Sequence, residues 1–209
     1  MISAQQALQQ SRDGNSRFVS DTSERSNLAY SANRDELLAG QAPFAIVLGC
    51  SDSRVPTEIV FDQGLGDLFV IRVAGNVGAA SQVGSVEFAA ERFATRLVVV
   101  LGHSQCSAVA TTSEELERPS ESRAPNIAAI VDFIRPSVQG LPKSDNRQQP
   151  DNLMRKAIRA NIRASVSHLR LRSNILRRMI RKTGLVVVGA EYSLATGIVE
   201  FFDDVPGNS

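Results

Sequence analysis

Two short segments near the middle of the chain hold both of its cysteines and one of its two histidines. The first is Cys-Ser-Asp-Ser-Arg at 50–54, and the second is His-Ser-Gln-Cys at 103–106. Two thiolates and one imidazole form a ligand set that zinc prefers, and three protein ligands leave a fourth position open for chemistry. Asp52 would lie beside that position, as a further ligand or as a proton acceptor. Arg54 would lie there as a cation that holds the Asp52 carboxylate. If the two segments meet in space, they form a metal site.

Each half of this pattern also has an ordinary interpretation. A cysteine after a buried strand is more often a small core residue than a ligand, and His103 could be a hydrogen-bonded core histidine. The metal hypothesis gains weight because Cys50 directly follows an apolar run and a glycine, and Cys106 lies three residues beyond His103, which does the same. A phosphatase-type nucleophilic cysteine is disfavoured, since Cys50 and Arg54 are too close for a loop that wraps a phosphate.

Short apolar runs must position the two segments. The runs at 44–48 and 97–101 end at Gly49 and Gly102, directly before Cys50 and His103. Further runs lie at 68–73 and 185–188, and such β-branched stretches suit strands buried on both faces of a parallel sheet. Both segments would then lie at the carboxyl ends of strands, where ligands collect in α/β folds.

Helical stretches alternate with these runs, notably 83–93 and the amphipathic segment 153–180, and a further helix is expected at 126–138. The stretches 112–125 and 139–150 are rich in polar residues and proline and are expected to be exposed connections. We therefore predict an α/β fold with a central, mostly parallel four-stranded β-sheet, a possible antiparallel edge strand, and flanking helices.

Length and composition favour a single domain over 1–209, since the chain has 209 residues, of which 43% are apolar. Its first 35 residues are expected to form an N-terminal helical arm, with a helix at 3–19, that packs on a partner subunit. No apolar run approaches the roughly 20 residues of a membrane span, and the start of the chain lacks the features of a signal peptide. We expect a soluble, cytoplasmic protein with reduced cysteines and no membrane partner.

The segment 153–182 holds ten Lys or Arg residues and no acid, which could indicate a nucleic-acid-binding face. Its apolar residues recur at helical spacing, so the arginines are expected mostly on the solvated face of a packed helix. No aromatic residues that could stack on bases are interleaved with them. We therefore expect no nucleic-acid partner.

The segment that starts at Cys50, followed downstream by Gly102-His103-x-x-Cys106, resembles the signature of the β-class carbonic anhydrases of the bacterial type. The resemblance is close over about residues 40–110. It implies one zinc ion per subunit, held by Cys50, His103 and Cys106, with water or Asp52 at the fourth position. It also implies an enzyme, a carbonate dehydratase that hydrates carbon dioxide reversibly to bicarbonate and a proton by the attack of zinc-bound hydroxide.

Electrostatics give Asp52 and Arg54 distinct roles in such a site. Two thiolates already neutralise the zinc dication, so a bound Asp52 carboxylate would make the site anionic and displace the water. A bidentate pair with Arg54 would hold that carboxylate off the metal and let it accept a hydrogen bond from the hydroxide. We expect the Asp52–Arg54 pair to control access to the fourth zinc position.

The resemblance also implies a substrate pocket that is completed in a homodimer, which can pair further into a homotetramer. Gln41 would donate a hydrogen bond, and Phe69 and Phe88 would form an apolar wall across the subunit interface. Ordinary core packing is the alternative for both phenylalanines. Ser107 stands where the family usually has glycine, and it could add a hydrogen bond or narrow the pocket.

Three questions stay open at this level. Bicarbonate-regulated members of the family carry tryptophan where this chain has Val47, which slightly disfavours such regulation here. Gly49, Arg72 and Tyr192 nevertheless resemble other parts of the regulatory pocket. His168 is the remaining imidazole, and a surface role is favoured over proton transfer. The alternatives to a carbonic anhydrase are a related zinc hydrolase for carbonyl sulfide or carbon disulfide, and a closed structural zinc site. The structural site is least favoured, because it needs no residue to keep a fourth ligand away.

Overall fold

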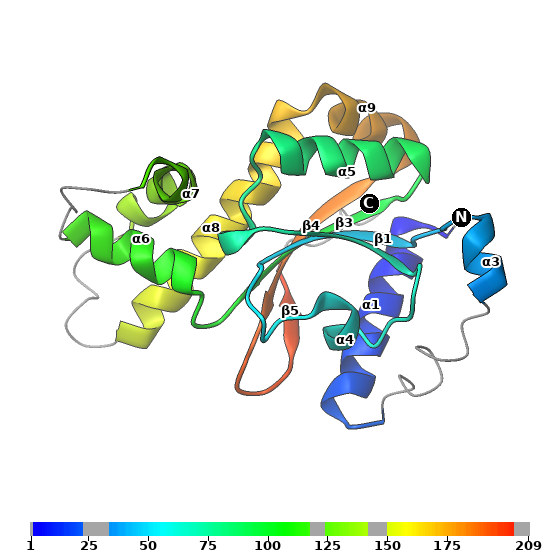
Figure 1. Ribbon diagram of the computed structural model, residues 1–209, viewed down its shortest axis with the longest axis horizontal. Helices are drawn as coiled ribbons and strands as arrows, with labels where there is room; N and C mark the ends of the chain where they lie inside the picture. The colour runs from blue at the N-terminus through cyan, green and yellow to red at the C-terminus, as the bar shows by residue number, and fades with distance from the viewer. Residues whose placement is uncertain (1, 23–33, 118–123, 142–149, 203–209) are drawn as a thin grey trace, which may run out of the picture.

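A five-stranded sheet forms the centre of the computed structural model, which describes residues 2–22, 34–117, 124–141 and 150–202 (Figure 1). The strand order is β2-β1-β3-β4-β5, with the first four strands parallel and β5 antiparallel to β4. The predicted fold class is thus confirmed, with the antiparallel edge strand present. The strands are β1 (Ala45–Gly49), β2 (Leu68–Arg72), β3 (Leu97–His103), β4 (Val186–Tyr192) and β5 (Val199–Phe201).

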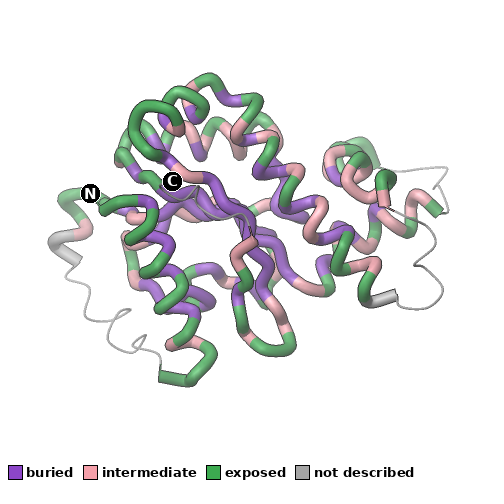
Figure 2. The backbone as a smooth tube through the Cα atoms, turned by 180° about the vertical axis from the view of Figure 1, so that it is seen from behind, coloured by how far each residue is buried: buried purple, intermediate pink, exposed green. Residues whose placement is uncertain are grey.

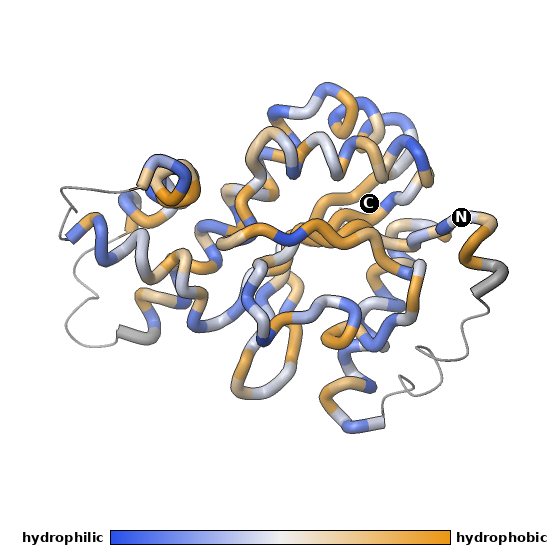
Figure 3. Tube along the Cα trace, in the orientation of Figure 1, coloured by the Kyte–Doolittle hydropathy of each residue, from blue (hydrophilic) through white to orange (hydrophobic). Residues whose placement is uncertain are grey.

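The central strands β1 and β3 are buried along their whole length, as their continuous apolar sequences predict (Figures 2 and 3). Alternate side chains point to opposite faces of the sheet, so each strand serves two cores. Ile46 and Leu48 of β1 belong to one core cluster, and Ala45 and Val47 belong to the other. Helices must therefore cover both faces.

The helices lie on both faces and beside the sheet. In Figure 1, α5 and α9 lie above the sheet, α1 and α4 lie below it, and α6 and α7 pack together at one side. The long helix α8 joins these parts, since it contacts β3, β4, α6 and α7. The helices are α1 (Ala4–Val19), α3 (Arg34–Ala39), α4 (Thr57–Val60), the short 3-10 helix η1 (Ala74–Asn76), α5 (Ala80–Arg92), α6 (Ser107–Glu117), α7 (Pro125–Gln139), α8 (Pro150–Arg172) and α9 (Asn174–Thr183).

The N-terminal helix α1 packs on the sheet of its own chain. Ala7 and Leu8 are buried in the core cluster below the sheet. The Asn15 amide donates to the Val60 and Gly197 carbonyls at 3.1 and 2.9 Å, so it connects α1 to α4 and to the turn before β5. Contact of the 1–35 arm with a partner subunit stays a prediction, and residues 23–33 lie outside the described part.

The amphipathic segment 153–180 was expected as one helix, but it falls in two, α8 and α9, which is a correction to the prediction. The break falls at Ser173, whose Oγ accepts a hydrogen bond from the Leu176 amide at 2.9 Å and so caps α9. The same hydroxyl donates to Glu87 of α5 at 2.5 Å. Apolar residues continue at helical spacing through this position, but the helix ends there because the capping Ser173 also bonds to another helix.

The expected exposed connection at 112–125 is partly helical, because α6 runs on to Glu117. Thr112 and Ser113 are compatible with the helix since their hydroxyls donate to carbonyls four residues earlier, at 2.8 and 3.0 Å. The helix expected at 126–138 is confirmed as α7. Most of the 139–150 connection, residues 142–149, lies outside the described residues. Among the helices that are described, none is long and apolar enough to span a bilayer.

Candidate metal centre

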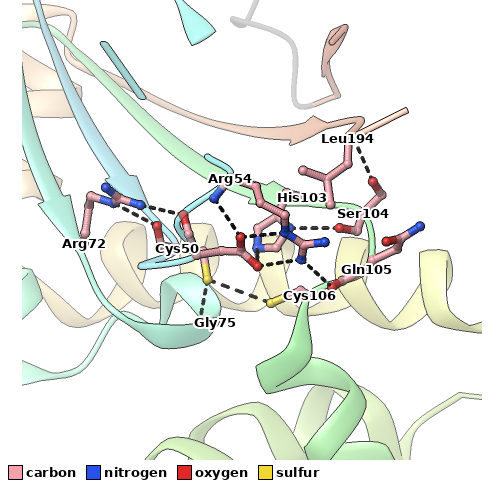
Figure 4. Close-up of polar contacts among 10 residues, drawn as sticks. Cys50, Arg54, Arg72, Gly75, His103, Ser104, Gln105, Cys106 and Leu194 are labelled. Atoms are coloured by element: carbon pink, nitrogen blue, oxygen red, sulfur yellow. Dashed lines mark hydrogen bonds and ion pairs between the residues drawn. The ribbon is translucent and has the colours of Figure 1, made fainter. Parts of the chain in front are cut away.

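The side chains of Cys50, His103 and Cys106 meet at the carboxyl ends of β1 and β3 (Figure 4). Their ligand atoms all lie within 4.8 Å of one another, and all three residues are buried. The two Sγ atoms are 4.0 Å apart, and the thiols are free. Two thiolates on a tetrahedral zinc, with zinc–sulfur bonds of about 2.3 Å, would be about 3.8 Å apart. The cluster therefore has the composition and size of a zinc site.

The His103 ring is oriented so that one nitrogen faces the two cysteines without a partner. Its Nδ1 lies 2.9 Å from the Ser104 carbonyl, which fixes the proton on Nδ1 and leaves the lone pair on Nε2. Nε2 is buried and has no hydrogen-bond partner within the described residues. The nearest Asp52 oxygen is 3.8 Å away, beyond hydrogen-bond distance. A metal ion would satisfy this nitrogen, so the residues present fit such an ion.

The two thiols differ in acidity because they share a hydrogen bond. The hydrogen bond from Cys106 lowers the pKa of Cys50, and the Gly75 amide 3.3 Å from its Sγ acts in the same direction. The same contact raises the pKa of Cys106, and burial adds to that effect. A metal ion that binds both sulfurs would require both thiols to lose their protons, so metal binding should release protons.

Asp52 and Arg54 form the expected bidentate pair beside the cluster. Arg54 Nε donates to Asp52 Oδ1 at 2.9 Å, and Arg54 Nη2 donates to Oδ2 at 2.7 Å. The Arg54 amide also donates to Oδ1, at 3.0 Å. The hydrogen bonds from Arg54 hold the pKa of Asp52 well below its usual range. The carboxylate is thus ionised, and both of its oxygens accept hydrogen bonds from Arg54 while Oδ2 lies 3.8 Å from His103 Nε2.

Two further residues support the first segment and were not assigned this role from the sequence. Arg72 donates to the Cys50 and Asp52 carbonyls at 3.1 and 2.6 Å. The buried Asn161 of α8 donates to the Gly75 carbonyl at 2.8 Å, and the Gly75 amide donates to Cys50 Sγ. Two signals in the sequence could have indicated these roles. Arg72 stands opposite Gly49 in the parallel register of the strands, and Asn161 is a polar residue on the buried face of its helix.

Position 75, whose amide donates to Cys50 Sγ, requires glycine. Its φ is +68°, in the region that favours glycine, and a Cβ there would lie 2.7 Å from Ile134 Cδ1. The close approach lets α7 pack against η1 while the Gly75 amide faces the sulfur. The packing of the helices thereby positions a hydrogen-bond donor at the cluster.

Of the predicted substrate-pocket residues, Ser107 directly follows Cys106, whereas no described contact joins the other three to the cluster. Gln41 is exposed in the segment before β1, and Ser107 is exposed as the first residue of α6. Phe69 and Phe88 pack together with Phe93, with ring centroids 5.9 to 6.3 Å apart. Phe88 is 57% exposed, so this aromatic cluster stays open in the single chain. A pocket that a partner subunit completes stays a prediction.

His168, the other histidine, is half-buried on α8, with its ring 5.3 Å from that of Phe133. Burial and the neighbouring Arg172 lower the pKa of His168 from its ordinary value of 6.5. The folded chain therefore binds this proton less tightly than the unfolded chain does. The contribution of His168 to the free energy of unfolding should therefore be complete above pH 6.5. It should be lost as the pH falls from 6.5 towards the lower pKa of His168 in the folded state.

This pH dependence can be measured with a His168→Gln variant, which has no proton to bind. Urea unfolding at about pH 7.5 and about pH 5.5 should show a larger loss of unfolding free energy in the parent than in the variant. Equal losses in both proteins would contradict the assignment. A His103 variant is unsuitable as a control, because it would also alter the metal centre.

Comparisons with known proteins agree with this arrangement. A family model described as carbonic anhydrase matches residues 45–199. The chain is 35% identical over 188 residues to carbonic anhydrase 2 of Mycobacterium tuberculosis, which covers 89% of this chain and 86% of that protein. It is also 35% identical over 196 residues to the carbonic anhydrase of Mycolicibacterium smegmatis, covering 90% and 88%.

Solved structures share the fold. The Coccomyxa β-carbonic anhydrase, solved in complex with acetazolamide, superimposes with a TM-score of 0.72 at 24% identity and covers 83% of this chain and 78% of that one. A β-carbonic anhydrase from Sordaria macrospora, one of two described as tetrameric, gives a TM-score of 0.69 at 20% identity and covers 84% and 88%. The fold is thus common to proteins of diverse sequence.

Proposed function

This chain belongs to the β-carbonic anhydrase family, and on that premise we propose that it hydrates carbon dioxide with one zinc ion held by Cys50, His103 and Cys106. The observation that carries the ligand set is the unpartnered His103 Nε2, buried beside two thiols whose sulfurs lie 4.0 Å apart. We further propose that the Asp52–Arg54 pair controls access to the fourth metal position. The reaction converts carbon dioxide and water to bicarbonate and a proton.

When bound, zinc supplies a Lewis acid that makes water acidic enough to react at neutral pH. The residues of the chain do the rest. Asp52, ionised and oriented by Arg54, accepts a hydrogen bond at the open position, while Arg54 prevents its carboxylate from moving to the metal. Arg72 holds the carbonyls of Cys50 and Asp52, so the ligand and the acceptor keep a fixed separation.

The paired state of Asp52 favours this enzyme over a closed structural site. In a closed site the carboxylate would face the metal, but here both oxygens are bonded to Arg54. We also propose a homodimer, since the aromatic cluster of Phe69, Phe88 and Phe93 lies beside the edge strand β2 and is partly open to solvent. Burial of this cluster against a second copy would complete an apolar pocket.

Rapid mixing of the zinc-loaded protein with carbon dioxide in the presence of a pH indicator tests the proposed function. We expect proton release far above the uncatalysed rate, with one zinc per chain by elemental analysis. A zinc-loaded sample without such release would refute the proposal. Sulfide release from carbonyl sulfide or carbon disulfide, with little carbon dioxide activity, would identify the related hydrolase instead.

The buried Asn161 offers a test of how the Cys50 sulfur is held. In Asn161→Leu the Gly75 carbonyl loses its donor at a buried position, so we expect a loss of about 1–3 kcal/mol in the free energy of unfolding. The Gly75 amide should then hold the sulfur less precisely and zinc affinity should fall, as measured by competition with a chelator.

Ser165→Ala is the matched control for Asn161→Leu. Ser165 lies one turn further along α8, and its buried Oγ has no hydrogen-bond partner within the described residues. This variant should therefore retain both stability and zinc affinity. Equal effects of the two substitutions would show that Asn161 has no particular link to the centre.

A further inference from the structure

A cavity lined by four arginines lies at the end of the sheet opposite the metal centre. It has a volume of about 660 Å³ and borders the amino ends of β3 and β4 and the start of α1. Its arginines come from three places in the chain: Arg96 just before β3, Arg170 on α8, and Arg177 and Arg181 on α9. Apolar side chains, including Ile180 and Leu185, complete the lining. The lining of the cavity thus combines cationic and apolar side chains.

The four guanidinium groups are held by neutral acceptors. Arg96 Nη1 donates to the Thr183 carbonyl at 2.7 Å, and Arg170 donates to the Val187 carbonyl. Arg177 donates to the Asn174 side chain, and Arg181 Nε donates to the Arg177 carbonyl at 3.3 Å. These bonds orient the groups, and each guanidinium retains further N–H donors.

Within the described residues, none of the four arginines forms an ion pair with a carboxylate. Other arginines of the same two helices do have acidic partners: Arg155 and Arg159 pair with Glu191, and Arg178 pairs with Glu91. The arginines of the cavity are therefore distinguished from their neighbours by the absence of a described ion pair. Four like charges that converge on one cavity are stabilised by a ligand of opposite charge.

We propose that this cavity binds a small molecule that carries two or more phosphoryl groups. Arginine forks match phosphate oxygens bidentately, and two phosphomonoester groups together carry about three to four negative charges at neutral pH. The volume of the cavity lies within the range of small-molecule pockets, roughly 300–1,000 Å³. Nucleic acid is disfavoured, since the cavity has no aromatic lining residue on which a base could stack.

This site is separate from the chemistry of the metal centre. Arg96 precedes β3 and His103 ends it, so the two sites are separated by the length of the strand, about 20 Å at roughly 3.3 Å per residue. Binding at the cavity requires no zinc. Its test is therefore independent of the proposed enzyme function.

Calorimetric titration of the zinc-loaded protein with inorganic tripolyphosphate tests the proposal. We expect saturable binding of one ligand per chain, with inorganic phosphate weaker by about tenfold or more because it engages fewer arginines. Zinc content measured before and after the titration separates binding from extraction of the metal. A parallel titration with ATP distinguishes the two kinds of ligand. If ATP binds more tightly than tripolyphosphate does, the ligand is organic and contacts the apolar lining residues. If ATP binds more weakly, the ligand is a free oligophosphate.

The double variant Arg177→Gln, Arg181→Gln should weaken tripolyphosphate binding by about tenfold or more. Arg172→Gln, Lys182→Gln is the matched control, since it removes the same charge from exposed positions of α8 and α9 outside the cavity, and it should change affinity by less than about twofold. The single variant Arg96→Gln, which alters no helix, tests the same site if the double variant is unstable. Absence of saturable binding to the parent protein, or equal weakening in the variant and its control, would overturn the proposal.

Discussion

Cys106→Ser is expected to lower the zinc content by about tenfold or more and to reduce carbon dioxide hydration in proportion. A serine hydroxyl is neutral at physiological pH and replaces thiolate poorly as a ligand at this buried position. The measurement is elemental analysis of the dialysed protein beside the rate of proton release. Circular dichroism establishes that the variant is folded.

Ser107→Ala serves as the control for the loss of the thiolate. Ser107 is the adjacent residue at the start of α6 and is exposed, so its substitution leaves the three proposed ligands in place. We expect this variant to keep its zinc. Full zinc retention in Cys106→Ser would show that Cys106 is not a ligand.

Arg54→Ala is expected to leave zinc bound but to lower activity by about one to two orders of magnitude. The substitution removes the two hydrogen bonds that the guanidinium donates to the Asp52 carboxylate and leaves only the one from the amide of residue 54 to Oδ1. This releases Oδ2, which lies 3.8 Å from His103 Nε2. The freed carboxylate can then occupy the fourth metal position. Cobalt substituted for zinc reports this change in its visible absorption spectrum, which depends on the ligands.

A second substitution separates this blocking effect from a general disturbance of the loop. In Asp52→Ala, Arg54→Ala the carboxylate is absent, so the cobalt spectrum should return to that of the open site, although the acceptor for the reaction is also lost. Unchanged activity in Arg54→Ala would remove the basis for a clamp. A closed spectrum in the double variant would attribute the block to another group.

The clustering of the two cysteines with His103 was predictable because the sequence clearly marks the ends of the strands. Apolar runs end at Gly49 and Gly102, and parallel strands bring such ends to one edge of the sheet. The roles of Arg72 and Asn161 were not assigned, since their hydrogen bonds depend on strand register and on how α8 packs against η1. Helical spacing shows that a residue faces the core, but not which backbone group it meets there.

The arginine-lined cavity shows the same limit more strongly. Helical periodicity placed the basic residues of 153–182 on a solvated face, as for a single continuous helix. The break at Ser173 redirects the chain, so that Arg177 and Arg181 of α9 line one cavity with Arg170 of α8. The break is stabilised by a hydrogen bond to Glu87, which lies 86 residues away in the chain. Sequence patterns that consider one helix at a time do not contain this information.

The positions of Cys50 and Cys106 also bear on how the protein would acquire the proposed zinc ion. The two thiols are 56 residues apart and come together only because β1 and β3 pair as neighbours. An ion bound by both closes a loop whose ends the sheet has already joined, so it is expected to enter late, after the hydrophobic core has formed. Zinc scarcity should then yield folded but inactive molecules, which can be activated later without new synthesis.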